Sequence, residues 1–66
     1  MHLVINGEEK QFTGISTLAS LVEQLGLKAD RLAIELNRDI VPRTHWNQTA
    51  LNEGDRLEIV HFVGGG

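Results

Sequence analysis

One helical pattern, lying between strand-like segments, most constrains how this chain can fold. Its apolar residues recur at i, i+3, i+4 and i+7 and so form a single stripe along a helix. They are Leu18, Leu21, Val22 and Leu25. Ser16 or Thr17 can cap the start of this helix, and Gly26 suits its C-terminal end. A lone helix buries its stripe by covering one face of a sheet, so we expect a two-layer α+β domain.

The segments before the helix predict a β-hairpin. Residues 3–5 are apolar and β-prone, Asn6-Gly7 follows them, and residues 10–13 read as the second strand. Asn-Gly is a strong turn signal because both residues tolerate a positive φ. Glu8-Glu9 either lengthens this turn or begins the second strand.

The segments after the helix predict three more strands. Residues 32–36 form one, and Asn37-Arg38-Asp39 turns into a short strand at 40–41, which Pro42 stops. Residues 43–51 are expected to be irregular or briefly helical. Glu53-Gly54-Asp55 is a turn before a final strand at 56–63. We expect this last strand at the centre of a mixed sheet of four to five strands, parallel to the first.

Size and composition exclude several functions. The 66 residues make one domain, expected at 1–63 with a tail at 64–66, and contain no cysteine. Disulfides, zinc–thiolate sites and a catalytic thiol are therefore excluded. A net charge of −3 disfavours nucleic acid and anionic membranes as partners. The three histidines show no metal-ligand spacing. Without a membrane-length apolar run or a signal peptide, the expected location is the cytoplasm.

The chain as given ends in Gly64-Gly65-Gly66, directly after the last predicted strand. Residues without a Cβ form a thin and flexible arm, which extended reaches roughly 10 Å. We expect the Gly66 carboxylate to be a free group that this arm presents to a narrow channel in another protein. The alternative is an inert, frayed end. The glycines are no phosphate loop, because no helix follows them.

Alternation along the last strand predicts two faces. Leu57 and Ile59 are expected in the core, whereas Val60 and Phe62 face away from the helix. This apolar pair is a candidate docking patch, unless loop residues or Trp46 cover it. Trp46 itself is expected to pack, with its indole N–H satisfied at the surface.

Two other side chains are weighed for function. Arg43 either pairs with an acidic residue of a partner or is simply solvated. His61 is expected at the rim of the core rather than to act as a catalytic base.

Four segments together carry a resemblance to a known family. They are the Asn6-Gly7 hairpin, residues 37–43 (NRDIVPR) followed by Trp46, residues 51–59 (LNEGDRLEI), and residues 60–66 (VHFVGGG). The chain resembles the ubiquitin-like β-grasp sulfur carriers, most closely the ThiS family of thiamine biosynthesis. The resemblance covers essentially the whole sequence.

This resemblance implies a carrier that is a cosubstrate and not an enzyme, with no bound cofactor or metal. A ThiF-like adenylating enzyme would use ATP to activate the carboxylate of Gly66, while Gly64 and Gly65 thread the partner's channel. A sulfur donor such as a cysteine desulfurase would then convert the adenylate to a thiocarboxylate. A ThiG-like thiazole synthase would take the sulfur into the thiazole of thiamine.

Chemistry gives an independent reason for activation. A carboxylate with a pKa of about 3.5 is ionised at neutral pH and is a poor electrophile, whereas a mixed anhydride with AMP carries a good leaving group.

Three alternative functions stay open on the residues alone. They are a sulfur carrier for molybdopterin or tRNA thiolation, a ubiquitin-like modifier that is joined to lysines, and a β-grasp interaction module with an inert tail.

Overall fold

Five strands form one mixed sheet whose central strand is the last in the chain. The computed structural model describes residues 1–62. The strands are β1 (His2–Ile5), β2 (Glu8–Gln11), β3 (Leu32–Leu36), β4 (Asp39–Ile40) and β5 (Arg56–His61). Their order is β2-β1-β5-β3-β4, with β1 parallel to β5 and the other pairs antiparallel. The expected central position of the last strand, parallel to the first, is confirmed.

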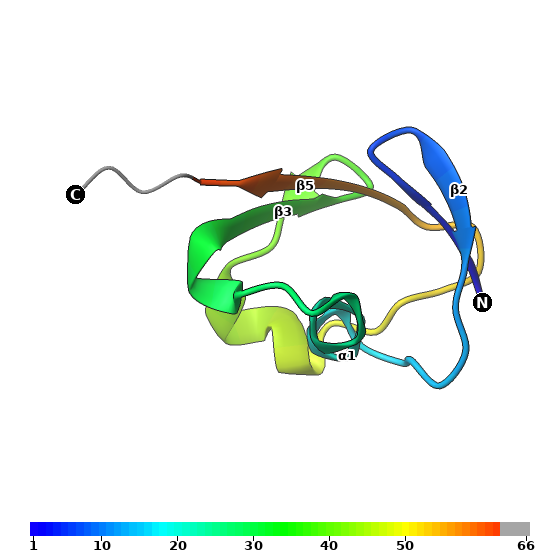
Figure 1. Cartoon of the computed structure of the whole chain (residues 1–66), viewed down its shortest axis with the longest axis horizontal. Coiled ribbons are helices and arrows are strands. Elements are labelled where there is room, and N and C mark those ends of the chain that lie inside the picture. The colour runs from blue at the N-terminus through cyan, green and yellow to red at the C-terminus, as the bar shows by residue number, and fades with distance from the viewer. Residues whose placement is uncertain (63–66) are drawn as a thin grey trace.

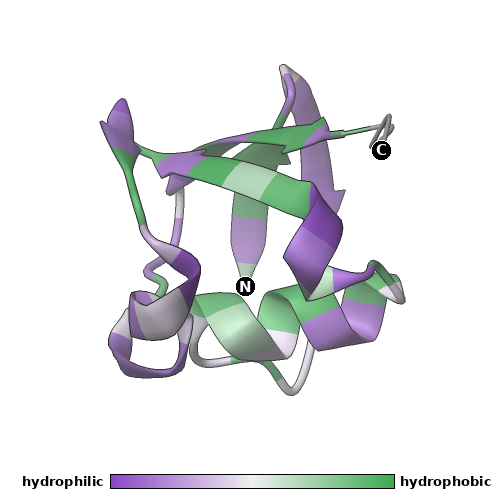
Figure 2. Cartoon of the chain, turned by 90° about the vertical axis from the view of Figure 1, so that its left-hand side faces the viewer, coloured by the Kyte–Doolittle hydropathy of each residue, from purple (hydrophilic) through white to green (hydrophobic). Residues whose placement is uncertain are grey.

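One helix covers a single face of this sheet. Helix α1 (Leu18–Leu25) lies below the strands in Figure 1, and two 3₁₀ helices, η1 (Ala29–Arg31) and η2 (Arg43–Gln48), accompany it. Figure 2 shows apolar residues in both layers where they face each other. The buried core contains Leu3, Ile5, Phe12, Leu18, Leu21, Val22, Leu32, Ile34, Trp46, Leu51 and Leu57. The expected α+β, ubiquitin-like architecture is therefore observed.

Local chemistry sets both ends of α1. The Thr17 hydroxyl accepts the backbone N–H of Ser20 at 3.2 Å, and the Ser20 hydroxyl accepts the backbone N–H of Thr17 at 2.9 Å. This reciprocal capping box satisfies two backbone donors at the start of the helix. Gly26 ends α1 with a φ of 71°, the left-handed conformation expected there. Thr17, rather than Ser16, is thus the cap.

Several predicted boundaries need correction. Glu8 begins β2, so the β1–β2 turn contains only Asn6 and Gly7, and β2 ends at Gln11 instead of residue 13. The fourth strand is Asp39–Ile40 instead of residues 40–41. Strand β5 ends at His61, and Phe62 follows it outside the strand. The predictions for Val63 and for the tail at 64–66 lie outside the described residues.

The predicted environment of Trp46 is also wrong in one respect. Its side chain does pack, but it is only 3% exposed, and its indole N–H donates to the C=O of Val41 at 2.8 Å. The donor is thus satisfied inside the domain and not at the surface. The bond fixes η2 against the segment that follows β4.

Candidate functional site: the end of β5 and the outer sheet face

Strand β5 changes from core to surface along its length. Leu57 is 2% exposed and Ile59 is half-buried, as the alternating pattern predicts. Val60 is 57% exposed and Phe62 is 49% exposed. The strand is therefore anchored at its start, whereas Val60 near its end and Phe62 just beyond it present apolar side chains to solvent a few residues before the glycine tail in the sequence.

Two neighbouring strands support β5 to different extents. Strand β3 pairs along it from Leu36↔Leu57 to Leu32↔His61. Strand β1 pairs with it only at Val4↔Arg56 and Ile5↔Leu57. Among residues 1–62, the end of β5 is consequently paired with β3 alone.

The asparagine of the first turn extends the contact between β1 and β5. Its φ of 51° turns the chain away after Ile5. The Oδ1 of Asn6 accepts the backbone N–H of Ile59 at 2.8 Å, and its Nδ2 donates to the C=O of Ile59 at 3.2 Å. The side-chain amide thus stands in for a strand residue. The sequence predicted the turn but not this bond, because the two residues are 53 positions apart.

Three of the described apolar side chains are exposed on the outer face of the sheet. Cross-strand partners share a face, and Val60 pairs with Ala33 while Ile40 pairs with Glu35. Ile40, 73% exposed, therefore lies on the same outer face as Val60 and Phe62. Ile40 was not predicted from the sequence, because its face follows from the register of β4 opposite Glu35. We call Ile40, Val60 and Phe62 the outer apolar patch.

Neither Trp46 nor a loop within residues 1–62 covers Val60 and Phe62. The alternative considered for these two residues is therefore wrong for the described part of the chain. Trp46 is buried in the helical layer, on the other side of the sheet. Docking through the patch stays a prediction. The exposed state of both side chains is what such docking requires.

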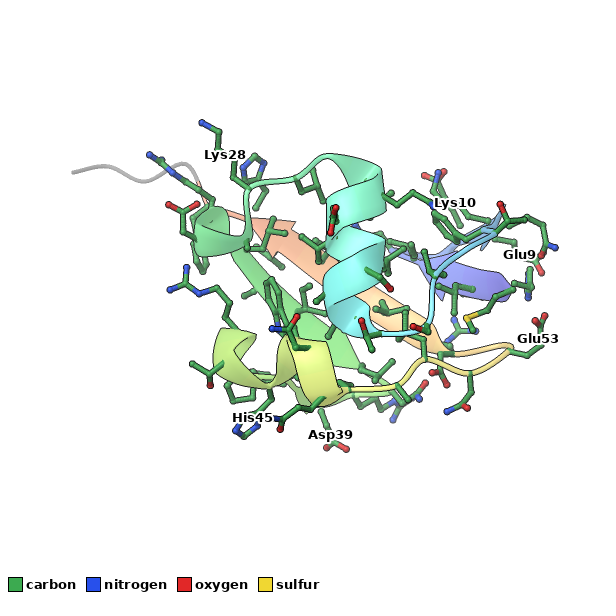
Figure 3. The ribbon with its side chains drawn as sticks, turned by 90° about the horizontal axis from the view of Figure 1, so that it is seen from below. Glu9, Lys10, Lys28, Asp39, His45 and Glu53 are labelled. Carbon is green, nitrogen blue, oxygen red and sulfur yellow. The ribbon has the colours of Figure 1, made fainter. Side chains whose placement is uncertain are left out.

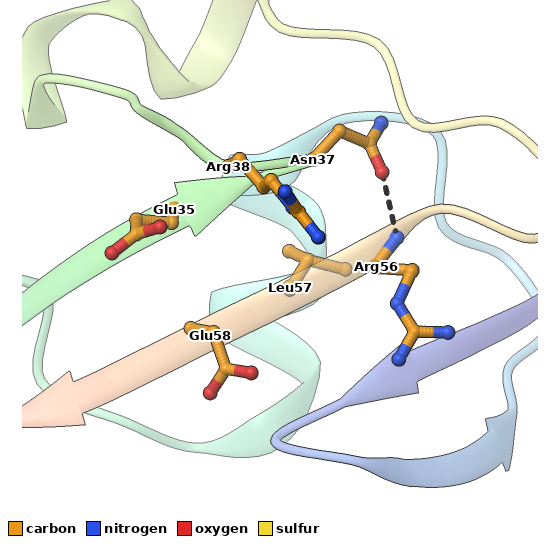
Figure 4. Close-up of a pocket in the computed structure, with 6 residues that line it drawn as sticks. All are labelled: Glu35, Asn37, Arg38, Arg56, Leu57 and Glu58. Atoms are coloured by element: carbon orange, nitrogen blue, oxygen red, sulfur yellow. Dashed lines mark hydrogen bonds between the residues drawn. The ribbon is translucent and has the colours of Figure 1, made fainter.

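A charged recess lies beside the patch on the outer face. Its volume is about 370 Å³, and Figure 4 shows side chains of both signs around it. One of them, Arg38, has a φ of 77°, a conformation that favours glycine. The recess is lined by Glu35, Asn37, Arg38, Arg56, Leu57 and Glu58. None of its charged side chains was predicted from the sequence to form a site, and Glu35 was expected to be simply solvated.

The structure separates Arg43 from the other candidate interface residues. Arg43 begins η2 and is exposed. It lines a groove of about 350 Å³ in the helical layer, together with Ala19, Val22 and Trp46. If Arg43 contacts a partner, that contact belongs to a different side of the domain from the outer apolar patch.

The remaining charged groups form no further site among the described residues. The labelled charged side chains point outward in Figure 3. His2 lies 2.9 Å from Glu9 and 3.9 Å from Glu53. Figure 3 shows both glutamates at the end of the molecule opposite to the end of β5. No group of three or more potential metal ligands occurs within residues 1–62. No helix in this part of the chain is long and apolar enough to cross a membrane.

Comparisons with known proteins agree on one family. The family model described as "ThiS family" matches residues 3–66. The sulfur carrier protein ThiS of Escherichia coli is 30% identical over 66 residues, covering 100% of both chains. A crystal structure of the thiamine biosynthesis protein ThiS from Geobacter metallireducens matches with a TM-score of 0.84 at 29% identity, again covering 100% of both chains.

Another similarity is to part of a larger protein. A thiazole synthase from Paramagnetospirillum magneticum is 48% identical over 66 residues, which cover 100% of this chain and 20% of that protein. The chain therefore spans about a fifth of the length of this relative.

Proposed function

Because the chain belongs to the ThiS family, we propose that it is a sulfur carrier protein whose Gly66 carboxylate delivers sulfur to the thiazole of thiamine. The observation that carries this proposal is the family match over residues 3–66, which includes the glycine tail. The same fold over the whole length of a ThiS structure supports it.

The proposed chemistry begins with activation of Gly66. A carboxylate oxygen attacks the α-phosphorus of ATP in a ThiF-like enzyme, which forms the acyl-adenylate and releases pyrophosphate. Hydrosulfide then attacks the carbonyl carbon and displaces AMP, leaving a thiocarboxylate without any change of redox state. Where a cysteine desulfurase supplies the sulfur as a persulfide, a thiol must also reduce the resulting acyl disulfide.

The chain contributes delivery rather than catalysis. Gly64 and Gly65 have no side chains to obstruct a narrow channel. The sequence contains no cysteine, so the sulfur has no thiol of the carrier itself on which to reside. A terminal thiocarboxylate provides that place. General bases, metals and ATP belong to the partner enzymes.

A thiazole synthase is the proposed receiver of the sulfur. A protein with that name contains a segment that is 48% identical to the whole of this chain. Joining two proteins in one polypeptide raises their effective concentration, which benefits partners that must meet in every catalytic cycle. The outer apolar patch is the proposed docking surface, with Val60 and Phe62 closest in sequence to the tail.

Intact-mass analysis tests the proposal. The protein is incubated with ATP, a ThiF-like adenylating enzyme and a sulfur source, and the expected product carries one oxygen replaced by sulfur. A variant that lacks Gly65 and Gly66, and a reaction without ATP, are the matched controls and should show no change. The mass of the purified cellular protein should correspond to a chain that ends at Gly66.

Other outcomes would identify other functions. Isopeptide-linked targets without thiocarboxylate would indicate a protein modifier. A thiocarboxylated protein that binds molybdopterin synthase but not thiazole synthase would assign the carrier to another sulfur acceptor. An unchanged mass with a competent adenylating enzyme would overturn the carrier function altogether.

A further inference from the structure

The hydrogen-bond pattern of β5 shows which backbone groups remain open. In an antiparallel pair, residues alternate between hydrogen-bonded and non-hydrogen-bonded positions. The N–H of Phe62 donates to the C=O of Arg31, and the N–H of Asn37 donates to the C=O of Arg56, both at 2.8 Å. Every second residue of β5 therefore turns its backbone groups toward β3. The residues between them turn theirs to the opposite edge and are Leu57, Ile59 and His61.

These three residues differ in the hydrogen-bond partners of their backbone groups on that edge. The C=O of Leu57 accepts the N–H of Asn6 at 2.9 Å. Ile59 is bonded at both its N–H and its C=O by the Asn6 side chain. Within the described part of the chain, the N–H and C=O of His61 have no partner on this side, and His61 is exposed. We call these two groups of His61 the free edge of β5.

The free edge results from the geometry of the first hairpin. Strand β1 ends at Ile5, and the turn at Asn6 and Gly7 takes the chain back into β2. Figure 4 shows the hairpin ending part of the way along β5, whose remaining length has β3 on one side only. Unpaired strand edges are the templates to which other proteins add strands.

From this geometry we infer that an extended segment of the adenylating enzyme pairs with the free edge of β5 at His61 and so extends the sheet into the partner. The inference rests on the proposed function, because it assigns the occupant to the enzyme that receives the tail. Such pairing would align the last residues of the carrier before they enter the enzyme.

The short length of the free edge favours an occupant that also binds the glycine tail. One residue offers one donor and one acceptor, and each exposed backbone bond contributes little net free energy. A separate peptide or a second copy of the chain would thus be held too weakly. A protein that also binds the tail gains the bonds at almost no further entropic cost, since His61 and Gly66 are only five residues apart.

Substitution by proline isolates the backbone donor. His61→Pro removes the N–H that points to the free edge, at a position where β3 makes no bond with it. His61→Ala removes the side chain but keeps the N–H, and it serves as the matched control. Binding to the ThiF-like adenylating enzyme, measured by calorimetry, should weaken about tenfold for proline relative to alanine.

Hydrogen exchange tests the inference on the unaltered protein as well. In the free protein the His61 amide should exchange quickly, whereas the bonded amides of Ile59 and Phe62 should be protected. Addition of the adenylating enzyme should protect His61 strongly. This measurement tests strand pairing at His61 even where the proline variant does not fold.

The possible failures can be told apart. Equal affinities of both variants, or an unchanged exchange rate at His61 in the complex, would overturn the strand pairing while Gly66 is still adenylated. A concentration-dependent dimer of the wild-type chain that His61→Pro abolishes would assign the free edge to a second copy instead. Absence of both binding and adenylation for the wild-type protein would overturn the proposed function together with this inference.

Discussion

The two parts of β5 belong to one strand but have different surroundings. Its first part, residues 56–59, has β1 and the Asn6 side chain on one edge, β3 on the other and the core beneath Leu57. Within residues 1–62, its last part has only β3 beside it and exposes Val60, and Phe62, which follows the strand, is exposed as well. A small domain can thus concentrate its stability in one part of a strand and leave the part next to the tail open to a partner.

The largest expected difference in stability is between substitutions at Leu57, in the first part of β5, and at Val60, in its last part. Leu57→Ala should lower the free energy of unfolding by about 2–5 kcal/mol, because Leu57 is 2% exposed and its loss leaves a cavity. Val60→Ala should change it by only about 0.5 kcal/mol, since its side chain is 57% exposed. Urea unfolding of both variants measures the difference. Comparable losses would contradict the contrast between the two parts of β5.

The features that could be predicted from the sequence are those that local patterns encode. The stripe of α1, its C-terminal end at Gly26, an N-cap at Ser16 or Thr17, and the Asn6-Gly7 turn follow from spacing and residue type, and the structure selects Thr17. The buried partner of the Trp46 indole could not be predicted, because it depends on how η2 packs. For the same reason the position of Arg43, away from the outer apolar patch, was not apparent.

The site was predicted in part. Alternation correctly placed Val60 and Phe62 at the surface, since period two needs no tertiary information. Ile40 required the register of β4 opposite Glu35. The free edge at His61 required knowing where β1 ends relative to β5, which is a property of the assembled sheet.

The second largest effect concerns the Asn6 side chain, which bonds to Ile59 at the end of the first part of β5. Asn6→Gly keeps the residue's positive φ accessible but removes both bonds to Ile59, so stability should fall by about 1–2 kcal/mol. Amide exchange at Ile59 should accelerate as well.

Asn37→Gly is the matched variant in the other asparagine turn. The Asn37 side chain accepts the N–H of Arg56 at 3.0 Å and donates to Asp55 at 3.0 Å. Its loss should expose the Arg56 amide and leave Ile59 protected. Faster exchange at Ile59 in this variant would mean that β5 opens as one unit.

The third effect concerns the backbone strain of Arg38, in the turn between β3 and β4. Arg38 has a φ of 77° in its turn, whereas Gly7 occupies the corresponding place, with a φ of 82°, in the first hairpin. Arg38→Gly should therefore raise stability by about 0.5–1 kcal/mol. Gly7→Ala should lower it by about 1 kcal/mol through conformation alone, because no atom lies within 4 Å of the added Cβ. Thermal unfolding of both variants checks these opposite signs.

The smallest effect on stability should accompany a large effect on binding. Phe62 is 49% exposed and lies beyond the last residue of β5, so Phe62→Ser should change the free energy of unfolding by only about 0.5 kcal/mol. Its backbone N–H bond to Arg31 does not involve the side chain and should remain. Exposed aromatic side chains often dominate an interface, so affinity for a thiazole synthase should fall at least about tenfold.

Ile40→Ser, at the far edge of the same patch, separates a broad apolar contact from one centred beside the tail. A smaller loss for Ile40→Ser would locate the partner at the end of β5. Unchanged affinity of Phe62→Ser would remove the outer apolar patch from the docking surface and leave the tail and the free edge as its remaining parts.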